Sequence, residues 1–200
     1  MPHQARAPVD TAVASDGAAA ENVPADGSVK RIAVAVEAIS GGTRVEVFND
    51  GGWVERAISD LATAVNATVA SYAYDNANLQ AALLDRLGGS TPFACRVVVD
   101  KGQLVSGSCA RMRSSLRVLA RAGAHVRVAG GRGRRNVGCM HLKAFVLGTT
   151  VAYVGSANFT NQAASHNWEQ VLRLEGAPVA DVLSGVVRCW ESGVAAELNG

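Results

Sequence analysis

The stretch CMHLKAFVLGTTVAYVGSANFTNQAASHNWEQV, residues 139–171, contains two apolar runs joined through the polar pair Thr149 and Thr150. Two short apolar runs separated by about two residues are typical of a β-hairpin. Side chains two positions apart in a strand face the same side of the sheet. His141 and Lys143 are therefore expected to project together from the first strand of this hairpin.

The same alternation predicts that Leu142 and Ala144 point into the core. The turn after the second strand is expected to bring Gly155, Ser156 and Asn158 to one end of the sheet. Polar side chains from two strands should then lie close together.

These side chains are chemically suited to bind and cleave a phosphodiester. The imidazole of His141 offers a nucleophile at neutral pH. The ammonium of Lys143 can neutralise one phosphate oxygen, and the hydroxyl of Ser156 and the amide of Asn158 can donate to the others. Such a set can attack a phosphodiester without a metal ion.

The spacing of these residues resembles that of the phospholipase D-like (HKD) phosphodiesterases, whose motif reads H-x-K-x4-D followed after six residues by G-S-x-N. His141 and Lys143 fall at the first two positions, and GSAN at residues 155–158 falls at the last four. The segment NWE at residues 167–169 is similar to the N-x-E element of the family. The resemblance is to members with a single motif and extends over residues 45–192.

This resemblance implies a role for each residue. His141 would be the nucleophile and would form a covalent phosphohistidine, which divides one displacement into two easier ones. Lys143, Ser156 and Asn158 would hold phosphate oxygens, where charge grows in the transition state. Glu169 would accept a hydrogen bond from the imidazole and fix its tautomer. No metal or other cofactor is implied.

A second histidine must protonate the leaving oxygen. The other histidines are poor candidates, because His3 lies near the N-terminus, His125 begins an expected strand and His166 is interpreted as a capping or surface residue. The sequence contains no second H-x-K. We therefore expect a homodimer in which two copies of His141 face each other in one active site at the two-fold interface.

The chain departs from the motif at Gly148, where the family has aspartate, and at Leu142, where a polar residue is common. If that aspartate orients the catalytic set, this chain binds a substrate without cleaving it. Gly148 is expected at the hairpin end, away from His141 and Lys143, where glycine can relieve the turn by taking a positive φ. We therefore expect the site to be catalytically active despite Gly148.

Charge is distributed unevenly along the chain. The formal net charge is only +2, but residues 101–168 contain ten lysines and arginines and no acidic residue. Three of these arginines, Arg132, Arg134 and Arg135, lie in the glycine-rich segment GGRGRRNVG just before His141. We expect these three to bind phosphate groups of an anionic substrate.

Composition places the chain among soluble, cytoplasmic proteins with one folded domain. The chain has 200 residues, of which 48% are hydrophobic, and no apolar stretch reaches the roughly 20 residues that a membrane-spanning helix needs. Residues 1–29 are expected to be a disordered tail, because they show no helical or strand period, and residues 30–200 to form the phosphodiesterase domain. The four widely spaced cysteines indicate no zinc cassette and no disulfide framework.

Hydrophobic periodicity predicts an α/β fold with a mixed β-sheet flanked by helices on both faces, which the resemblance describes as a phospholipase D-like sandwich. Trp53, Trp168 and Trp190 are expected in the core. The expected strands are residues 31–38, 43–48, 67–74, 93–100, 124–130, 139–148, 150–156 and 167–176, and the expected helices are 51–66, 76–89, 108–123 and 178–193.

The sequence thus favours a metal-independent phosphodiesterase, first of all a nuclease acting on DNA or RNA. A phospholipid hydrolase is the alternative within the same chemistry, and a catalytically inactive nucleic-acid-binding module is the alternative from another class. The expected site comprises His141, Lys143, Glu169, Ser156, Asn158, Arg132, Arg134 and Arg135.

Overall fold

The computed structural model describes residues 34–36, 42–105, 109–132 and 138–198. The tail expected at residues 1–29, together with Arg134 and Arg135 of the arginine segment, lies outside the described residues.

The described residues form one mixed sheet of nine strands in the order β1-β2-β8-β7-β6-β3-β4-β5-β9. The neighbours β3, β4 and β5 run parallel, and all other neighbouring pairs are antiparallel. The expected mixed sheet is therefore confirmed. The strands are β1 (Val34–Val36), β2 (Arg44–Phe48), β3 (Asn66–Ser71), β4 (Ala94–Asp100), β5 (His125–Ala129), β6 (Lys143–Leu147), β7 (Val151–Gly155), β8 (Val171–Glu175) and β9 (Val194–Ala195).

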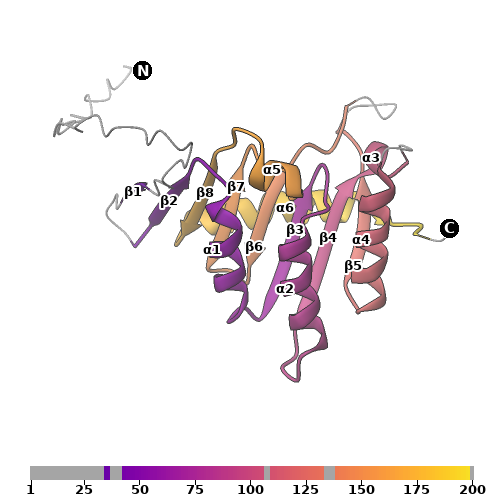
Figure 1. The fold of residues 1–200 in the computed structure, drawn as a ribbon, viewed down its shortest axis with the longest axis horizontal. Helices are drawn as coiled ribbons and strands as arrows, with labels where there is room; N and C mark the ends of the chain where they lie inside the picture. Colours follow the sequence, from indigo (N-terminus) through magenta and orange to yellow (C-terminus); the bar gives the residue numbers. More distant parts are fainter. Residues whose placement is uncertain (1–33, 37–41, 106–108, 133–137, 199–200) are drawn as a thin grey trace, which may run out of the picture. The chain divides into compact units, whose positions relative to one another are not determined.

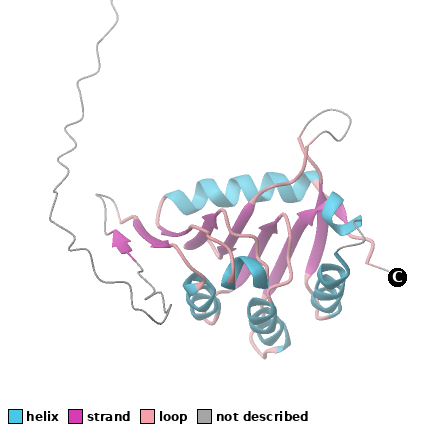
Figure 2. Ribbon diagram, turned by 45° about the horizontal axis from the view of Figure 1, so that its top comes forward, coloured by secondary structure: helices cyan, strands magenta, loops and turns pink. Residues whose placement is uncertain are grey.

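Helices cover both faces of this sheet, as expected. Helices α1, α2 and α4 lie side by side on one face and the long helix α6 crosses the other (Figures 1 and 2). The two short helices α3 and α5 were not expected from the sequence. The helices are α1 (Gly52–Leu61), α2 (Ala77–Gly88), α3 (Lys101–Val105), α4 (Ala110–Arg121), α5 (Asn161–Ser165) and α6 (Pro178–Ser192). No helix in this described part of the chain is long and apolar enough to cross a membrane.

The side chains of strand β6 contribute alternately to two hydrophobic cores, one on each face of the sheet. Phe145 and Leu147 belong to the apolar cluster that includes residues of α1, α2 and α4. Ala144 and Val146 belong to a second cluster that includes Val179 of α6. Because side chains alternate between faces and both faces are covered, the strand is apolar at successive positions.

The expected hairpin is confirmed, since β6 and β7 pair antiparallel with Leu147 opposite Val151. Its first strand was expected from Cys139 but begins only at Lys143, so His141 precedes the strand. Gly148 begins the connecting turn with a φ of +57°. Leu142, however, was expected in the core and is 41% exposed, because it precedes the first residue of β6 and lines a pocket beside α6.

The three tryptophans differ in environment. Trp53 is fully buried, as expected, and Trp190 is partly buried. The expectation was wrong for Trp168, which is 93% exposed. The strand expected at residues 167–176 begins only at Val171, so Trp168 lies in the segment that leads into the sheet.

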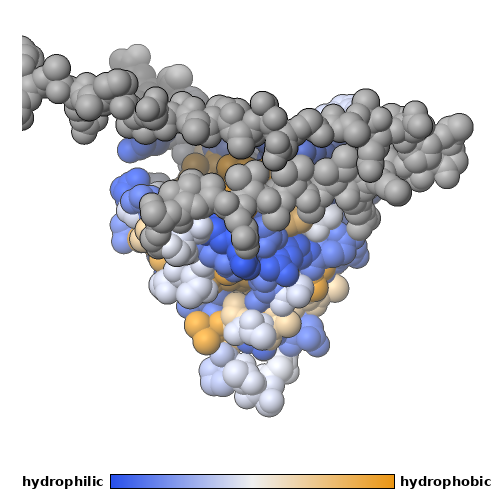
Figure 3. All heavy atoms as spheres, turned by 90° about the vertical axis from the view of Figure 1, so that its left-hand side faces the viewer, coloured by the Kyte–Doolittle hydropathy of each residue, from blue (hydrophilic) through white to orange (hydrophobic). Residues whose placement is uncertain are grey.

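A buried ion cluster braces the β2 side of the sheet. Arg173 on β8 is 2% exposed, and its Nε lies 2.6 Å from Asp60 Oδ2 of α1, with Glu46 at 3.3 Å and Glu175 also in contact. The hydroxyl of Tyr153 donates to the same Asp60 oxygen. Figure 3 views this end of the molecule, where the described surface is mostly hydrophilic with small separate hydrophobic areas.

Candidate active site

The expected site residues gather at one edge of the sheet. Ser71, the last residue of β3, pairs with Lys143, the first of β6. Gly155, the last residue of β7, pairs with Val171, the first of β8. The start of β8, the end of β7, the start of β6 and the end of β3 therefore follow one another along this edge, which lies beside α5 in Figure 1.

His141 and Lys143 lie in direct contact. Lys143 Nζ is 3.1 Å from His141 Nδ1 and also donates to the backbone oxygen of His141 at 3.0 Å. An ammonium group can only donate hydrogen bonds, so Nδ1 accepts and the neutral imidazole carries its proton on Nε2.

Partial burial lowers the pKa of Lys143 below its ordinary value, while Cys139 and Glu169 act in the opposite direction. The Glu169 carboxylate itself is hydrogen-bonded to Ser156 and Asn167.

A compact turn fixes Glu169. Its Oε2 accepts from the hydroxyl of Ser156, and its Oε1 accepts from Asn167 Nδ2 at 3.1 Å. Ser156 is held in turn by Gln170, through two hydrogen bonds of 3.0 Å that join its backbone N to Gln170 O and its Oγ to Gln170 N. A Cβ at Gly155 would lie 2.1 Å from that Gln170 oxygen, so this close approach requires glycine.

Asn158 lies half-buried two residues beyond Ser156. Its Oδ1 is buried and has no hydrogen-bond partner among the described residues. A buried polar atom of this kind points to a water or a ligand that completes the site.

Tyr72, which was not expected from the sequence, contacts both His141 and Lys143. Its ring centroid lies 5.0 Å from that of His141 at an interplanar angle of 60°, and Lys143 Nζ lies 5.6 Å from the same ring. Gln103 Nε2 donates to the Tyr72 hydroxyl at 2.7 Å. The available signal was its position directly after β3, at the edge where Lys143 begins β6.

Asp100 fixes the segment just before His141. The residue is 3% exposed, and its carboxylate accepts from the backbone N of Met140 at 2.8 Å and of Gln103 at 3.0 Å. Asp100 therefore links the last residue of β4 to the segment that carries the candidate nucleophile.

Gly148 lies far from these groups. It follows the last residue of β6, so the whole strand separates it from Lys143, a distance of about 17 Å at ~3.4 Å per residue. A Cβ at Gly148 would meet no atom within 4 Å. The expectation that this position lies at the hairpin end is confirmed.

Arg132 is exposed and lines a pocket of about 570 Å³ beside His141. The other walls come from the segment before β6 and from helix α6, which contributes Arg188. Of the three arginines expected to bind phosphate, Arg132 alone is among the described residues, and it lies on the candidate site's side of the sheet.

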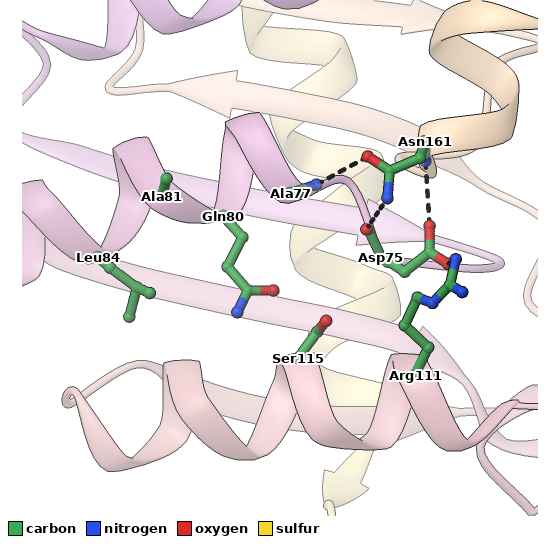
Figure 4. Close-up of a pocket in the computed structure, with 8 residues that line it drawn as sticks. All are labelled: Asp75, Ala77, Gln80, Ala81, Leu84, Arg111, Ser115 and Asn161. Carbon is green, nitrogen blue, oxygen red and sulfur yellow. Dashed lines mark hydrogen bonds and ion pairs between the residues drawn. The ribbon is translucent and has the colours of Figure 1, made fainter.

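A smaller pocket of about 300 Å³ lies between α2 and α4 (Figure 4). Asn161 closes one end, where its backbone N and Nδ2 donate to Asp75 and its Oδ1 accepts from the N of Ala77 at 3.0 Å. Arg111 lies 3.9 Å from the Asp75 carboxylate. These groups satisfy one another, so we interpret this cluster as a brace between α5 and the start of α2.

Among the described residues, no group of three or more histidine, cysteine or acidic side chains could hold a metal ion. Cys139 is exposed and Cys95 is buried, and no disulfide joins the four described cysteines.

Solved structures with a similar arrangement of helices and strands define the class of fold. NucT from Helicobacter pylori has a TM-score of 0.67 and 17% identity, and the match covers 77% of this chain and 99% of that one. Nuc from Salmonella typhimurium, described as a phospholipase D family member, has a TM-score of 0.64 and 16% identity, covering 78% and 97%. The archaeal chromatin protein TrmBL2 has a TM-score of 0.53 and 16% identity, covering 76% and 55%.

A family model described as "Cardiolipin synthase, PLD-like domain" matches residues 60–188, which is more than half of the chain. The chain therefore belongs to this phospholipase D-like family, and the resemblance found in the sequence is confirmed. Comparison with curated protein sequences gave no match.

Proposed function

We propose that this protein is a metal-independent phosphodiesterase, specifically a nuclease, that acts through a phosphohistidine intermediate in a homodimer. The observation that carries the proposal is the 3.1 Å contact between Lys143 Nζ and His141 Nδ1, at the sheet edge that also holds Ser156, Asn158 and Glu169.

The first step frees the nucleophile. In the unliganded arrangement Lys143 donates to Nδ1, so the proton of a neutral His141 occupies Nε2 and blocks attack from that atom. A bound phosphate competes for the ammonium. The imidazole proton then moves to Nδ1, where Glu169 accepts it as a hydrogen bond, and Nε2 gains the lone pair needed for attack.

Attack forms a bond between Nε2 of His141 and phosphorus and breaks the bond from phosphorus to the leaving oxygen. His141 of the partner subunit, in its doubly protonated imidazolium form, gives one proton to that oxygen and becomes a neutral imidazole. A water molecule then attacks the phosphohistidine, the nitrogen–phosphorus bond breaks, and the partner's His141 regains a proton. Lys143, Ser156 and Asn158 bind the oxygens on which charge increases.

The homodimer follows from the need for that acid. His125 begins β5, which runs parallel to β3, so it lies at the sheet edge opposite the end of β3 and the candidate site. His166 is exposed, and its Nδ1 lies 2.7 Å from Ser165 Oγ. We assign His166 a surface role and expect a second copy of the chain to provide the acid.

Charge favours nucleic acid as the substrate. The ten basic and no acidic residues between 101 and 168 include the exposed Arg132, and Arg134 and Arg135 follow it in sequence. A basic surface beside the catalytic pair suits a polymer with one negative charge per nucleotide. The archaeal chromatin protein TrmBL2, which shares this fold, binds DNA.

A phospholipid is the second candidate substrate. The matching family model is described as cardiolipin synthase, and phosphatidylserine synthase of Haemophilus influenzae Rd KW20 shares the fold with a TM-score of 0.59 at 11% identity, covering 78% of this chain and 40% of that one. The third candidate is a nucleic-acid-binding module without catalysis. It is considered because Gly148 replaces the aspartate of the family motif.

The deciding experiment incubates the purified protein in EDTA with end-labelled DNA, end-labelled RNA, or vesicles of phosphatidylcholine and cardiolipin. Cleavage of nucleic acid should persist in EDTA and be abolished by His141→Ala, while the matched control His166→Ala keeps activity within about threefold. A strict requirement for added magnesium, manganese or zinc would exclude the proposed nucleophile. Hydrolysis of vesicles alone would favour the lipid alternative, and binding without cleavage the inactive module.

Sedimentation tests the homodimer in the same preparation. A dimer is expected, and a fully active monomer would exclude the shared site.

A further inference from the structure

The 570 Å³ pocket beside His141 has no role in the steps proposed above. We call it the α6 pocket. One wall is the segment Cys139, Met140, His141 and Leu142, the opposite wall is Gly185, Arg188, Cys189 and Ser192 of α6, and Gly130 and Arg132 close one side. Its volume falls within the range of about 300–1,000 Å³ that is typical of small-molecule sites.

The chemistry of the α6 pocket divides into two parts. Apolar groups come from Met140, Leu142 and the two cysteines, and the cations are Arg132 and Arg188. Both arginines are at exposed positions, and Arg188 Nη1 donates to Ser184 Oγ at 2.7 Å. A guanidinium has five donors, so Arg188 can bind a phosphate while it keeps this bond.

An apolar slot with two guanidinium groups is complementary to a nucleotide, whose base is flat and weakly polar and whose phosphate is anionic. His141 forms part of the pocket wall, so an occupant lies next to the phosphate that His141 attacks. We propose that the α6 pocket binds the nucleotide adjacent to the scissile phosphate, with its base against Met140 and Leu142 and its phosphate on Arg132 and Arg188. This proposal rests on the proposed nuclease function and assigns a subsite to it.

Gly185 makes a sharp test possible. A Cβ at this position would meet only the Arg188 side chain, at 3.9 Å, and Gly185 lines the pocket, so we expect a larger side chain here to occupy part of it. Glycine inside a helix is less favourable than alanine by about 1 kcal/mol, so replacing it should not weaken α6. Gly185→Leu is therefore a variant that fills the pocket, and Gly185→Ala is its matched control.

The measurement compares kcat/KM on a labelled single-stranded oligonucleotide with kcat/KM on bis(4-nitrophenyl) phosphate, which has one phosphate and no nucleotide. Gly185→Leu should lower the value for the oligonucleotide at least tenfold and change that for the small diester less than twofold, with Gly185→Ala close to wild type. Arg188→Gln should lower oligonucleotide cleavage at least fivefold. Arg121→Gln, which removes an exposed charge at the end of α4, should have no such effect.

Unchanged oligonucleotide cleavage in Gly185→Leu would overturn the proposal, and so would an equal loss on both substrates at an unchanged melting temperature. If Gly185→Leu instead suppresses hydrolysis of cardiolipin vesicles and leaves the oligonucleotide unaffected, the pocket binds lipid and the proposal is wrong. If wild type cleaves neither substrate, the nuclease function itself has failed. Anisotropy of a labelled oligonucleotide then decides the subsite, which requires at least tenfold weaker binding by Gly185→Leu.

Discussion

Lys143 Nζ lies 3.1 Å from His141 Nδ1, so the candidate nucleophile and the neighbouring cation are in direct contact. This contact is local, because Lys143 is the first residue of β6 and His141 precedes it by two positions. It places a positive charge where a phosphate must arrive, and it holds the neutral imidazole in the tautomer that cannot attack through Nε2. In the proposed mechanism, one ammonium group therefore couples substrate binding to activation of the nucleophile.

Lys143→Arg should change the pH dependence of catalysis. Burial lowers the pKa of Lys143 from its ordinary 10.5, so the wild-type ammonium loses its proton, and the rate falls, at a lower pH than for a free lysine. Arginine stays charged throughout this range. We expect kcat/KM on bis(4-nitrophenyl) phosphate to fall about tenfold near neutral pH, because the planar guanidinium fits the site poorly, and its alkaline decline to disappear. Identical alkaline declines in both proteins would show that Lys143 is not the titrating group.

Tyr72 should act as a positioning residue for the catalytic pair. Its ring contacts His141 and Lys143, and each contact is worth about 0.5–1 kcal/mol. Tyr72→Leu removes both and should lower kcat roughly 5- to 30-fold. Tyr72→Phe keeps the ring and should stay within about threefold of wild type. Equal losses in both variants would instead indicate that the hydroxyl, which accepts from Gln103, is the important group.

Gly148→Asp should leave turnover unchanged. The position lies at the far end of β6 from Lys143, and its φ of +57° is one that aspartate tolerates better than most residues. The assay compares wild type, Gly148→Asp and His141→Ala on one labelled diester. If wild type is as inactive as His141→Ala and Gly148→Asp restores cleavage, the aspartate of the family motif is needed for catalysis and our interpretation fails.

Asp60→Ala should destabilise the fold by about 3 kcal/mol, because it leaves the buried Arg173 without its 2.6 Å partner. Burial alone would raise the pKa of Asp60, but hydrogen bonds from Arg173 and Tyr153 and the charges of Arg173 and Arg56 outweigh it, and the net shift is downward from 3.8. A carboxyl whose pKa is lower in the folded state contributes stability above its unfolded pKa and loses it as pH falls through the folded pKa.

The difference in unfolding free energy between wild type and Asp60→Ala should therefore be full at pH 7 and shrink below pH 3.8. Urea unfolding at several pH values measures it. Arg111→Ala is the control. Arg111 lies 3.9 Å from the Asp75 carboxylate and its side chain is 77% exposed, so this ion pair should contribute less than about 1 kcal/mol to the free energy of unfolding. A difference that does not depend on pH would mean that the charge of Asp60 is unimportant.

Much of the fold could be predicted from local pattern. The strand that places Phe145 and Leu147 on one face and Ala144 and Val146 on the other could be predicted from the sequence, and so could the turn at Gly148. Helices α1, α2, α4 and α6 also followed from their apolar periodicity. The short helices α3 and α5 and the two-residue strand β9 have too few residues to show any period.

Side chains outside regular elements were predicted least well. Trp168 and Leu142 were expected in the core because both fall within expected strands, but both lie in segments that lead into a strand and both are exposed. Exposure depends on which layer lies above a residue. Residue type gives only an average tendency.

By itself the sequence determined the spacing of His141 and Lys143, the strand that separates them from Gly148 and the motif that identifies the family, because all three depend on residues close together in the chain. Only the tertiary structure decided that Tyr72 of the β3 end contacts the pair, that Asp100 of β4 anchors the segment before it, and that α6 forms a pocket beside it. These contacts join residues 40 or more positions apart. They arise when parallel and antiparallel strands bring their ends to one edge of the sheet, an arrangement that no local pattern encodes.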